Sequence, residues 1–177
     1  AAVAPANQDG AAALGGVLEP IGRVGLGRVA GGGWRGGAAA GERGVAIVRR
    51  YDPSMPPILA DEDRLLQVFH NLVRNAMEAM PDGGRVTLIT RLSMNPLFAK
   101  MDVGKGLRTM AEVQVADEGL GIPEATRAKL FTPFFTTKDT GLGLGLALCH
   151  RIVEEHRGAI QVESQPGKGT AVSCFLP

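Results

Sequence analysis

Apolar and polar residues follow a helical period over residues 61–80. The apolar positions recur at i, i+3, i+4 and i+7, which is typical of an amphipathic helix that buries one face. Asp61 precedes the first of them as an N-cap, and the turn sequence PDGG ends the helix. The predicted buried stripe contains Leu65, Leu66, Phe69, Leu72, Val73, Ala76, Met77 and Met80.

Strand patterns lie on both sides of this helix. GVAIVRRYD (44–52) precedes it, and RVTLITR (85–91) and EVQVAD (112–117) follow it. AIQVES and TAVSCFLP close the chain as two strands joined by the turn QPGKG. Residues 92–111 carry no such pattern, so we expect a surface insertion there.

Two further helices complete the predicted order. PEATRAKLF is a short helix starting at Pro123, and LGLALCHRIVEEHRG is a longer one ended by Gly158. The order helix, strand, strand, helix, helix, strand, strand predicts an α+β fold in which one helical layer covers one face of a mixed sheet.

Residues 1–44 differ from the rest of the chain. They are rich in Gly and Ala with scattered Arg, and show neither helical nor strand periodicity. Such a composition buries too little apolar area to offset the entropy of ordering. We expect a flexible linker or a poorly ordered remnant of a longer protein, followed by one domain over residues 45–177.

Composition excludes several classes of function. The net charge of +1 predicts no general affinity for nucleic acid or anionic membranes. Cys149 and Cys174 lie in apolar stretches, as buried thiols do in reducing compartments. No apolar run approaches the roughly 20 residues of a membrane span, and no secretory signal opens the chain. The chain therefore reads as cytoplasmic, without a membrane segment.

Two amides share one face of helix 61–80. Asn71 and Asn75 are four residues apart at the margin of the apolar stripe, beside Gln67 and Glu78. A solvated helix face is one interpretation. The other is an amide oxygen that binds a hard cation such as Mg²⁺.

Further candidates follow the next strands. Asp117 ends a strand before Gly119 and Gly121, where a carboxylate can accept a hydrogen bond from an exocyclic amine, although an ordinary turn has the same residues. In LFTPFFTTK the phenylalanines are expected to be packing anchors, and Lys138 is a candidate cation for phosphate. In PGKGT, Thr170 offers a hydroxyl.

A glycine run precedes the last helix. Gly141, Gly143 and Gly145 can present backbone N–H groups at a helix N-terminus to an anion. The run is neither a P-loop nor a dinucleotide-binding motif, because Leu146 occupies the place of the third glycine of the latter. The alternating leucines of the run are expected to pack the helix onto the sheet, except Leu142, for which the sequence predicts no role.

The motifs together resemble the catalytic ATP-binding domain of sensor histidine kinases, in the superfamily of gyrase, the ninety-kilodalton heat-shock chaperone and MutL. NLVRNAMEA resembles the N box, DEGLGIP the G1 box, LFTPFFTTK the F box, GLGLGLAL the G2 box and GKGT the closing glycine-threonine element. The resemblance covers residues 45–177. FTPFFTTK and HRIVEEHRG are most similar to nitrogen-regulation sensor kinases.

The resemblance implies a two-layer α/β sandwich, the Bergerat ATP-binding fold, with ATP and Mg²⁺ as cofactors. It implies that Asn75 holds Mg²⁺, that Asn71 replaces the catalytic glutamate of ATP-hydrolysing relatives, and that Asp117 binds the adenine amino group. The remaining residues implied to contact ATP are Gly119, Gly121, Thr170, Lys138, Gly141, Gly143 and Gly145.

The implied activity is protein-histidine kinase. Its partners are a phosphoacceptor hairpin domain and, through it, a response regulator, and the isolated domain is expected to be monomeric. Hydrolysis needs a carboxylate near the γ-phosphate, and the neutral amide of Asn71 is a negligible base. A non-catalytic ATP-binding module and an ATP hydrolase are the alternatives.

The chain departs from the family pattern in three ways. Leu142 replaces a small hydroxyl residue, and Glu78 lies where some relatives place a lysine. Residues 1–44 contain no histidine to accept a phosphoryl group. The three histidines, His70, His150 and His156, are expected to be surface or packing residues.

Overall fold

The structure is a computed structural model that describes residues 11–12, 17–18, 39–40, 44–94, 109–137 and 141–177. In the described chain, a six-stranded sheet has the order β2-β3-β5-β6-β8-β7. Its strands are β2 (Ala39–Ala40), β3 (Val45–Arg50), β5 (Gly84–Ser93), β6 (Met110–Asp117), β8 (Gly169–Leu176) and β7 (Ala159–Gln165). β3 and β5 are parallel and the other neighbours are antiparallel, so the predicted mixed sheet is confirmed.

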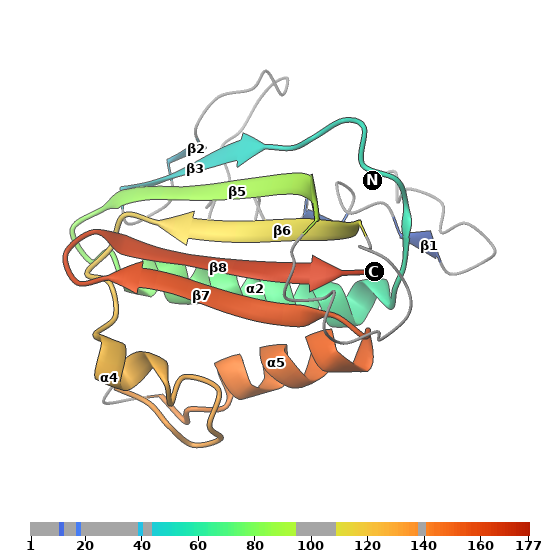
Figure 1. The fold of residues 1–177 in the computed structure, drawn as a ribbon. Coiled ribbons are helices and arrows are strands. Elements are labelled where there is room, and N and C mark those ends of the chain that lie inside the picture. Colours follow the sequence, from blue (N-terminus) through green and yellow to red (C-terminus); the bar gives the residue numbers. More distant parts are fainter. Residues whose placement is uncertain (1–10, 13–16, 19–38, 41–43, 95–108, 138–140) are drawn as a thin grey trace.

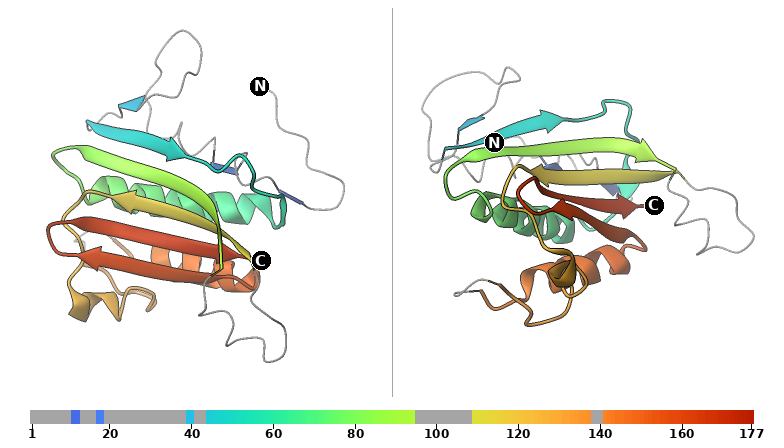
Figure 2. Two further views of the ribbon diagram at one scale, coloured as in Figure 1. Left: turned by 45° about the horizontal axis from the view of Figure 1, so that its top comes forward. Right: turned by 60° about the vertical axis from the view of Figure 1, so that its left-hand side comes forward.

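Two helices cover one face of this sheet. α2 (Glu62–Glu78) and α5 (Gly145–Glu155) lie side by side beneath the strands, and the short α4 (Glu124–Arg127) lies beyond one end of them (Figures 1 and 2). The predicted two-layer arrangement and the order of elements are therefore confirmed. α4 is shorter than the predicted helix over 123–131, and Pro123 is its N-cap rather than its first helical residue.

α2 begins and packs as its sequence predicts. The Asp61 carboxylate accepts a hydrogen bond of 3.1 Å from the Arg64 N–H, and two acidic residues in the first turn complement the helix dipole. Its buried residues are Leu65, Val68, Phe69, Leu72, Val73 and Ala76. Burying each large apolar side chain of this kind contributes about 1.5–3 kcal/mol to folding.

The strands supply the opposite half of the core. Val86 and Leu88 of β5 alternate with outward residues, and Val113 and Val115 of β6 continue the same buried layer. The predicted insertion over 92–111 is wrong at both ends, because β5 extends to Ser93 and β6 begins at Met110. Residues 95–108 lie outside the described residues.

The far face of the sheet contains a buried carboxylate. Glu112 of β6 is almost fully buried, and its two oxygens accept hydrogen bonds of 2.8 and 2.7 Å from the Arg91 guanidinium. Ser173 of β8 donates a third at 3.1 Å. Burial acts to raise the pKa of Glu112, but the Arg91 and Ser173 hydrogen bonds outweigh it and hold that pKa below the ordinary value.

α5 ends in a Schellman motif with an unexpected residue at its left-handed position. The Gly158 N–H donates to the Val153 carbonyl, and the Arg157 N–H donates to the Glu154 carbonyl. Arg157, with φ of 56°, occupies the position that glycine usually takes. Gly158 is required for another reason, because a Cβ there would lie 2.3 Å from the Phe175 carbonyl oxygen. The prediction that the helix ends at Gly158 agrees with this motif, in which Arg157 takes the left-handed position.

Part of the predicted linker contacts the domain. Val17 and Leu18 are buried in the core, and β1 (Ala11–Ala12) pairs with β4 (Ile58–Leu59). β2 pairs with β3 at one edge of the large sheet. Most of residues 1–44 lies outside the described residues, so the expectation of a poorly ordered linker stays a prediction.

Candidate functional site

Asp117 lies at the end of β6, where its carboxylate is fixed by the backbone. Its Oδ1 accepts hydrogen bonds from the Gly119 N–H at 2.9 Å and the Thr170 N–H at 3.2 Å. In the part of the chain that the structure describes, Oδ2 receives no hydrogen bond. One oxygen therefore holds the side chain in place and the other is available to a ligand that donates a hydrogen bond.

Burial shapes the acidity of this carboxyl. Desolvation raises the pKa of Asp117, and the backbone hydrogen bonds from Gly119 and Thr170 reduce the rise without cancelling it. A half-buried carboxylate with an unused acceptor gains stabilisation from any donor that reaches it. This property is typical of a binding residue.

The glycines around Asp117 allow three backbone segments to meet. A Cβ on Gly119 would lie 2.6 Å from the Ala79 carbonyl oxygen, at the end of α2. Gly121, with φ of 70°, and Gly169, with φ of 92°, each pass so close to a carbonyl oxygen that a Cβ would lie 2.0 Å from it. Gly169 was missed by the sequence analysis, although it directly precedes Thr170 in GKGT.

The hydroxyls of Ser164 and Thr170 lie in contact beside Asp117. The Ser164 hydroxyl donates to the Gly169 carbonyl at 2.9 Å and accepts from the Ile122 N–H at 2.8 Å. Since its only proton is used, the 2.9 Å contact between the Ser164 and Thr170 hydroxyls has Thr170 as donor. The Thr170 oxygen then keeps its acceptor capacity. Ser164 was not predicted, because nothing in AIQVES distinguishes it from a surface serine.

Asn71 and Asn75 are both half-buried on the polar side of α2. The Asn71 Oδ1 accepts a hydrogen bond of 3.2 Å from the Arg74 guanidinium. Gly145 begins α5 opposite this point, and a Cβ on it would lie 3.8 Å from the same oxygen. The predicted neighbours Asn71 and Gly145 are therefore brought together.

One face of α2 connects the Asn71–Gly145 contact with the residues around Asp117. Asn71, Asn75 and Ala79 follow one another at intervals of four residues, and Ala79 accepts a hydrogen bond of 3.3 Å from the Leu120 N–H. Asn71 thus marks the α5 end of the face, Ala79 marks the Asp117 end, and Asn75 lies between them. Figure 1 shows the end of α2, the end of β6, the β7–β8 turn and the start of α5 at the same end of the domain.

The glycine run contacts the backbone of the segment before it. Gly143 has φ of 67° and accepts a hydrogen bond of 3.0 Å at its carbonyl from the Phe134 N–H, so its first role is contact with the neighbouring backbone. The prediction that the leucines pack onto the sheet is wrong for Leu144, which is 41% exposed, whereas Leu146 packs against the core. Leu142, for which the sequence predicted no role, is 79% exposed. Gly141 is exposed. Lys138 lies outside the described residues.

The phenylalanines before the run also differ from expectation. Phe134 is 75% exposed and has a left-handed backbone with φ of 66°, so it is no packing anchor. Phe131 contacts the His150 ring with centroids 5.1 Å apart. An exposed aromatic residue in a strained backbone conformation is typical of a contact surface rather than a core.

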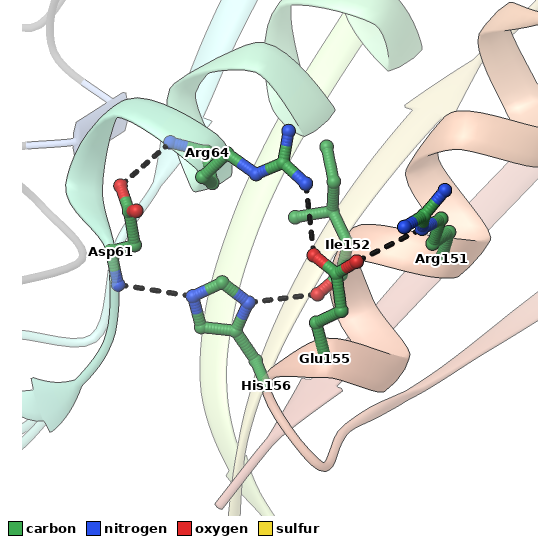
Figure 3. Close-up of polar contacts among 6 residues, drawn as sticks. All are labelled: Asp61, Arg64, Arg151, Ile152, Glu155 and His156. Carbon is green, nitrogen blue, oxygen red and sulfur yellow. Dashed lines mark hydrogen bonds and ion pairs between the residues drawn. The ribbon is translucent and has the colours of Figure 1, made fainter.

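A polar network joins the start of α2 to the end of α5, away from the candidate site (Figure 3). The His156 Nε2 accepts from the Asp61 N–H at 3.0 Å, and its Nδ1 contacts the Ile152 carbonyl at 2.7 Å. This geometry requires a neutral ring protonated at Nδ1. Glu155 binds Arg64 at 2.8 Å and Arg151 at 2.9 Å. The network fixes the two helices that line the candidate site at their other ends.

The other histidines are also packing or surface residues. His150 is half-exposed and lies 3.2 Å from Glu154 one turn away, and His70 is half-buried on α2. The expectation for all three histidines therefore agrees with their positions.

Comparison with known proteins identifies the family. Residues 60–177 match the family described as histidine kinase-, DNA gyrase B-, and HSP90-like ATPase. The chain belongs to this family. The match begins just before α2 and includes every candidate residue of the site.

Individual relatives narrow the comparison. The sensory histidine kinase/phosphatase NtrB of Azospirillum brasilense is 43% identical over 136 residues, which are 76% of this chain and 34% of the relative. Sporulation kinase A of Bacillus subtilis is 40% identical over 134 residues, which are 76% of this chain and 20% of the relative. The chain thus spans about a third or less of the length of these relatives.

Solved structures agree with this assignment. The nucleotide-free catalytic domain of the histidine kinase ThkA superimposes with a TM-score of 0.61 and 31% identity, over 77% of this chain and 80% of that one. Full-length ShkA in complex with AMPPNP superimposes with a TM-score of 0.72 and 28% identity, over 98% of this chain and 32% of that one. The α+β fold is therefore that of a histidine kinase catalytic domain. Within the described residues, no helix has the length and apolar character of a membrane span.

Proposed function

We propose that this domain binds Mg-ATP and transfers the γ-phosphoryl group to a histidine of a phosphoacceptor hairpin. The observation that carries the proposal is the linear arrangement along α2. Eight residues separate Asn71 from Ala79, which is about 12 Å of helix at 1.5 Å per residue. A nucleoside triphosphate laid along this face has its base at Asp117 and its phosphates near Asn75 and the start of α5.

The base site favours adenine by its hydrogen-bonding chemistry. The unused Oδ2 of Asp117 is an acceptor, and the 6-amino group of adenine is a donor. Gly119 and Gly121 leave the backbone beside this carboxylate without side chains, as a flat ring requires. The neighbouring ShkA structure contains AMPPNP, an adenine nucleotide, which supports the same ligand here.

The donor set at the phosphates suits Mg²⁺. The Asn75 amide oxygen is the kind of hard ligand that Mg²⁺ takes together with phosphate oxygens and water. Mg²⁺ would neutralise charge on the phosphates when bound. Lys138 is proposed as a further phosphate ligand on its position in the sequence alone.

Transfer is favoured over hydrolysis by the residue at position 71. The amide of Asn71 accepts from Arg74 and cannot deprotonate a water molecule. The nucleophile must therefore come from outside the domain. Phe134 and Leu142 are both exposed, and the Phe134 N–H binds the carbonyl of Gly143, the residue after Leu142. We infer that the hairpin docks against these two side chains, because its histidine has to reach the γ-phosphate at that end.

The biological role follows from the relatives rather than from the site. The similarity to NtrB proteins supports a place in a two-component system, with a response regulator receiving the phosphoryl group from the hairpin. Nitrogen regulation is the finer assignment that these relatives support.

The test combines binding with transfer. The domain is titrated with Mg-ATP by calorimetry, and γ-labelled Mg-ATP is then incubated with the domain and a purified hairpin from an NtrB relative. We expect saturable ATP binding, label on the hairpin and little free phosphate. Binding without labelled hairpin indicates a non-catalytic module, and rapid phosphate release that requires Asn71 indicates a hydrolase; either result contradicts the proposal.

A further inference from the structure

Arg74 occupies an unusual position between two helices. Its guanidinium Nη2 donates to the Asn71 Oδ1 at 3.2 Å, and the same Nη2 would lie 3.9 Å from a Cβ on Gly145, the first residue of α5. The side chain therefore reaches from the polar face of α2 to the N-terminus of α5. The sequence analysis did not single out Arg74, although it stands between the two asparagines of NLVRNAMEA.

This position places two positive groups side by side. A helix N-terminus carries about half a positive charge. Among the described residues, neither a side-chain cap nor an acidic residue in the first turn of α5 neutralises it. The nearby carboxylate of Glu78 forms only a loose contact with Arg74, at 3.9 Å from its Nε. The Arg74 side chain is 57% exposed, so an anion can reach the space between the guanidinium and the helix end, where both groups attract it.

Asn71 orients the Arg74 guanidinium and is itself oriented by the buried Cys149. Its Oδ1 faces Arg74, and its amide also forms a hydrogen bond with the sulfur of the buried Cys149. Burial raises the pKa of the Cys149 thiol to about 12, so this contact is with a neutral sulfhydryl. The Asn71 amide is thus held from both sides, with its oxygen occupied by Arg74.

We propose that Arg74 binds the γ-phosphate of ATP and that Asn71 positions it, leaving Asn75 as the ligand for Mg²⁺. The assignment rests on the proposed function. It supplies a cation at the point where Glu78 and Leu142 replace the lysine and the hydroxyl residue expected from the family pattern. A guanidinium suits this task because it offers several N–H donors in a fixed plane to phosphate oxygens.

The charge on Arg74 matters most as the phosphoryl group moves. The lone pair of a neutral imidazole nitrogen on the hairpin forms the new N–P bond. The P–O bond to ADP breaks, and its electron pair leaves on the β-phosphate oxygen. The second ring nitrogen releases its proton to water. Arg74 stabilises the negative charge on the three γ-oxygens throughout.

The experiment compares ATP with ADP, because only ATP has the γ-phosphate. Affinities for Mg-ATP and Mg-ADP are measured by calorimetry on the wild-type domain, Arg74→Ala, Arg74→Lys and the control Arg151→Ala. Arg151 is a suitable control because it is 76% exposed on α5 and its ion pair with Glu155 lies at the far end of the helix. Thermal unfolding of each variant checks folding.

We expect Arg74→Ala to weaken Mg-ATP binding roughly tenfold and Mg-ADP binding less than threefold. Arg74→Lys should recover part of the ATP affinity, and Arg151→Ala should change neither. Equal losses for ATP and ADP, with a lower melting temperature, mean that Arg74 only joins the helices and overturn the assignment, as does an unchanged ATP affinity. A wild-type domain that binds neither nucleotide overturns the proposed function itself.

Discussion

Replacing Asp117 by Asn changes the chemistry of one atom and leaves the shape of the side chain intact. The Gly119 and Thr170 N–H groups both bind Oδ1, and an asparagine keeps an oxygen at that position. The other position changes from an acceptor to an NH₂ donor. That donor faces the 6-amino group of adenine, which is also a donor. The substitution therefore removes a favourable contact and installs an opposed one without disturbing the backbone.

The substitution should affect both the affinity for Mg-ATP and the stability of the fold. A hydrogen bond to a charged group contributes about 1.5–3 kcal/mol, and each 1.4 kcal/mol is tenfold in affinity. With the opposed donors, we expect Mg-ATP affinity to fall about 100-fold. The stability of the folded domain, in contrast, should not fall. Burial raises the pKa of Asp117, so the folded domain disfavours the charged form and loses stability as pH rises through that pKa. An amide at position 117 avoids this cost at neutral pH, and the melting temperature should stay equal or rise.

The assay uses a second nucleotide and a neighbouring carboxylate. Guanine has a carbonyl oxygen where adenine has its amino group, so an asparagine at position 117 should favour Mg-GTP relative to Mg-ATP. Glu118→Gln is the control, because its carboxylate is exposed and pairs with the Arg85 side chain at 3.5 Å. ATP affinity within threefold of wild type and an unchanged ATP-to-GTP ratio would refute the adenine assignment. An equal loss in Glu118→Gln would refute its specificity.

Three further substitutions test other parts of the molecule. Arg157→Gly should raise the free energy of unfolding in urea by about 0.5–1 kcal/mol by relieving the left-handed position, whereas Gly158→Ala should lower it by about 1–3 kcal/mol; equal effects contradict the Schellman description. Glu112→Gln should cost about 1–2 kcal/mol at pH 7 and progressively less as pH falls through the folded pKa of Glu112, since the lowered pKa gives stability that is present above about 4.5 and lost below the folded pKa; a cost independent of pH excludes this ionic contribution. Phe134→Asn, which suits a left-handed backbone, should slow hairpin phosphorylation at least tenfold and leave Mg-ATP affinity within twofold, while the equally exposed Leu59 changed to Asn should affect neither; equal slowing in both excludes a docking role for Phe134.

Most of the fold could be predicted because its elements bury one face each. The periodicity of residues 61–80 and the cap at Asp61 specify α2 without reference to the rest of the chain. The alternation in β5 does the same for a half-buried strand. Burial on both faces of a strand, as in β6, could not be predicted from alternation. Glu112 lies at an outward position of β6 and becomes buried because Arg91 and Ser173 from neighbouring strands cover it, a consequence of register that local sequence does not reveal.

The candidate site could be predicted as a set of residues but not as a set of roles. Motif order brought Asp117 and Thr170 together, and the register of β6 with β8 pairs these two residues directly. Exposure was predicted less well, because apolar residues in a loop have no period to compare with burial. Phe134 and Leu144 were expected to pack and instead lie exposed. Arg74 was overlooked because its role depends on α5, which approaches it only in the folded chain.

The distribution of charge explains how a chain of net charge +1 can hold a triphosphate. The long-range field is weak, so attraction has to come from groups that face one point. Arg74 and the uncapped N-terminus of α5 provide two of them within a few ångströms, and the Asn71 amide holds the guanidinium in place. None of these groups can act as a base, so they stabilise phosphate charge without activating water. Under the proposed function, such a site favours transfer to an incoming nucleophile, and we propose that the domain carrying that nucleophile docks at the exposed Phe134.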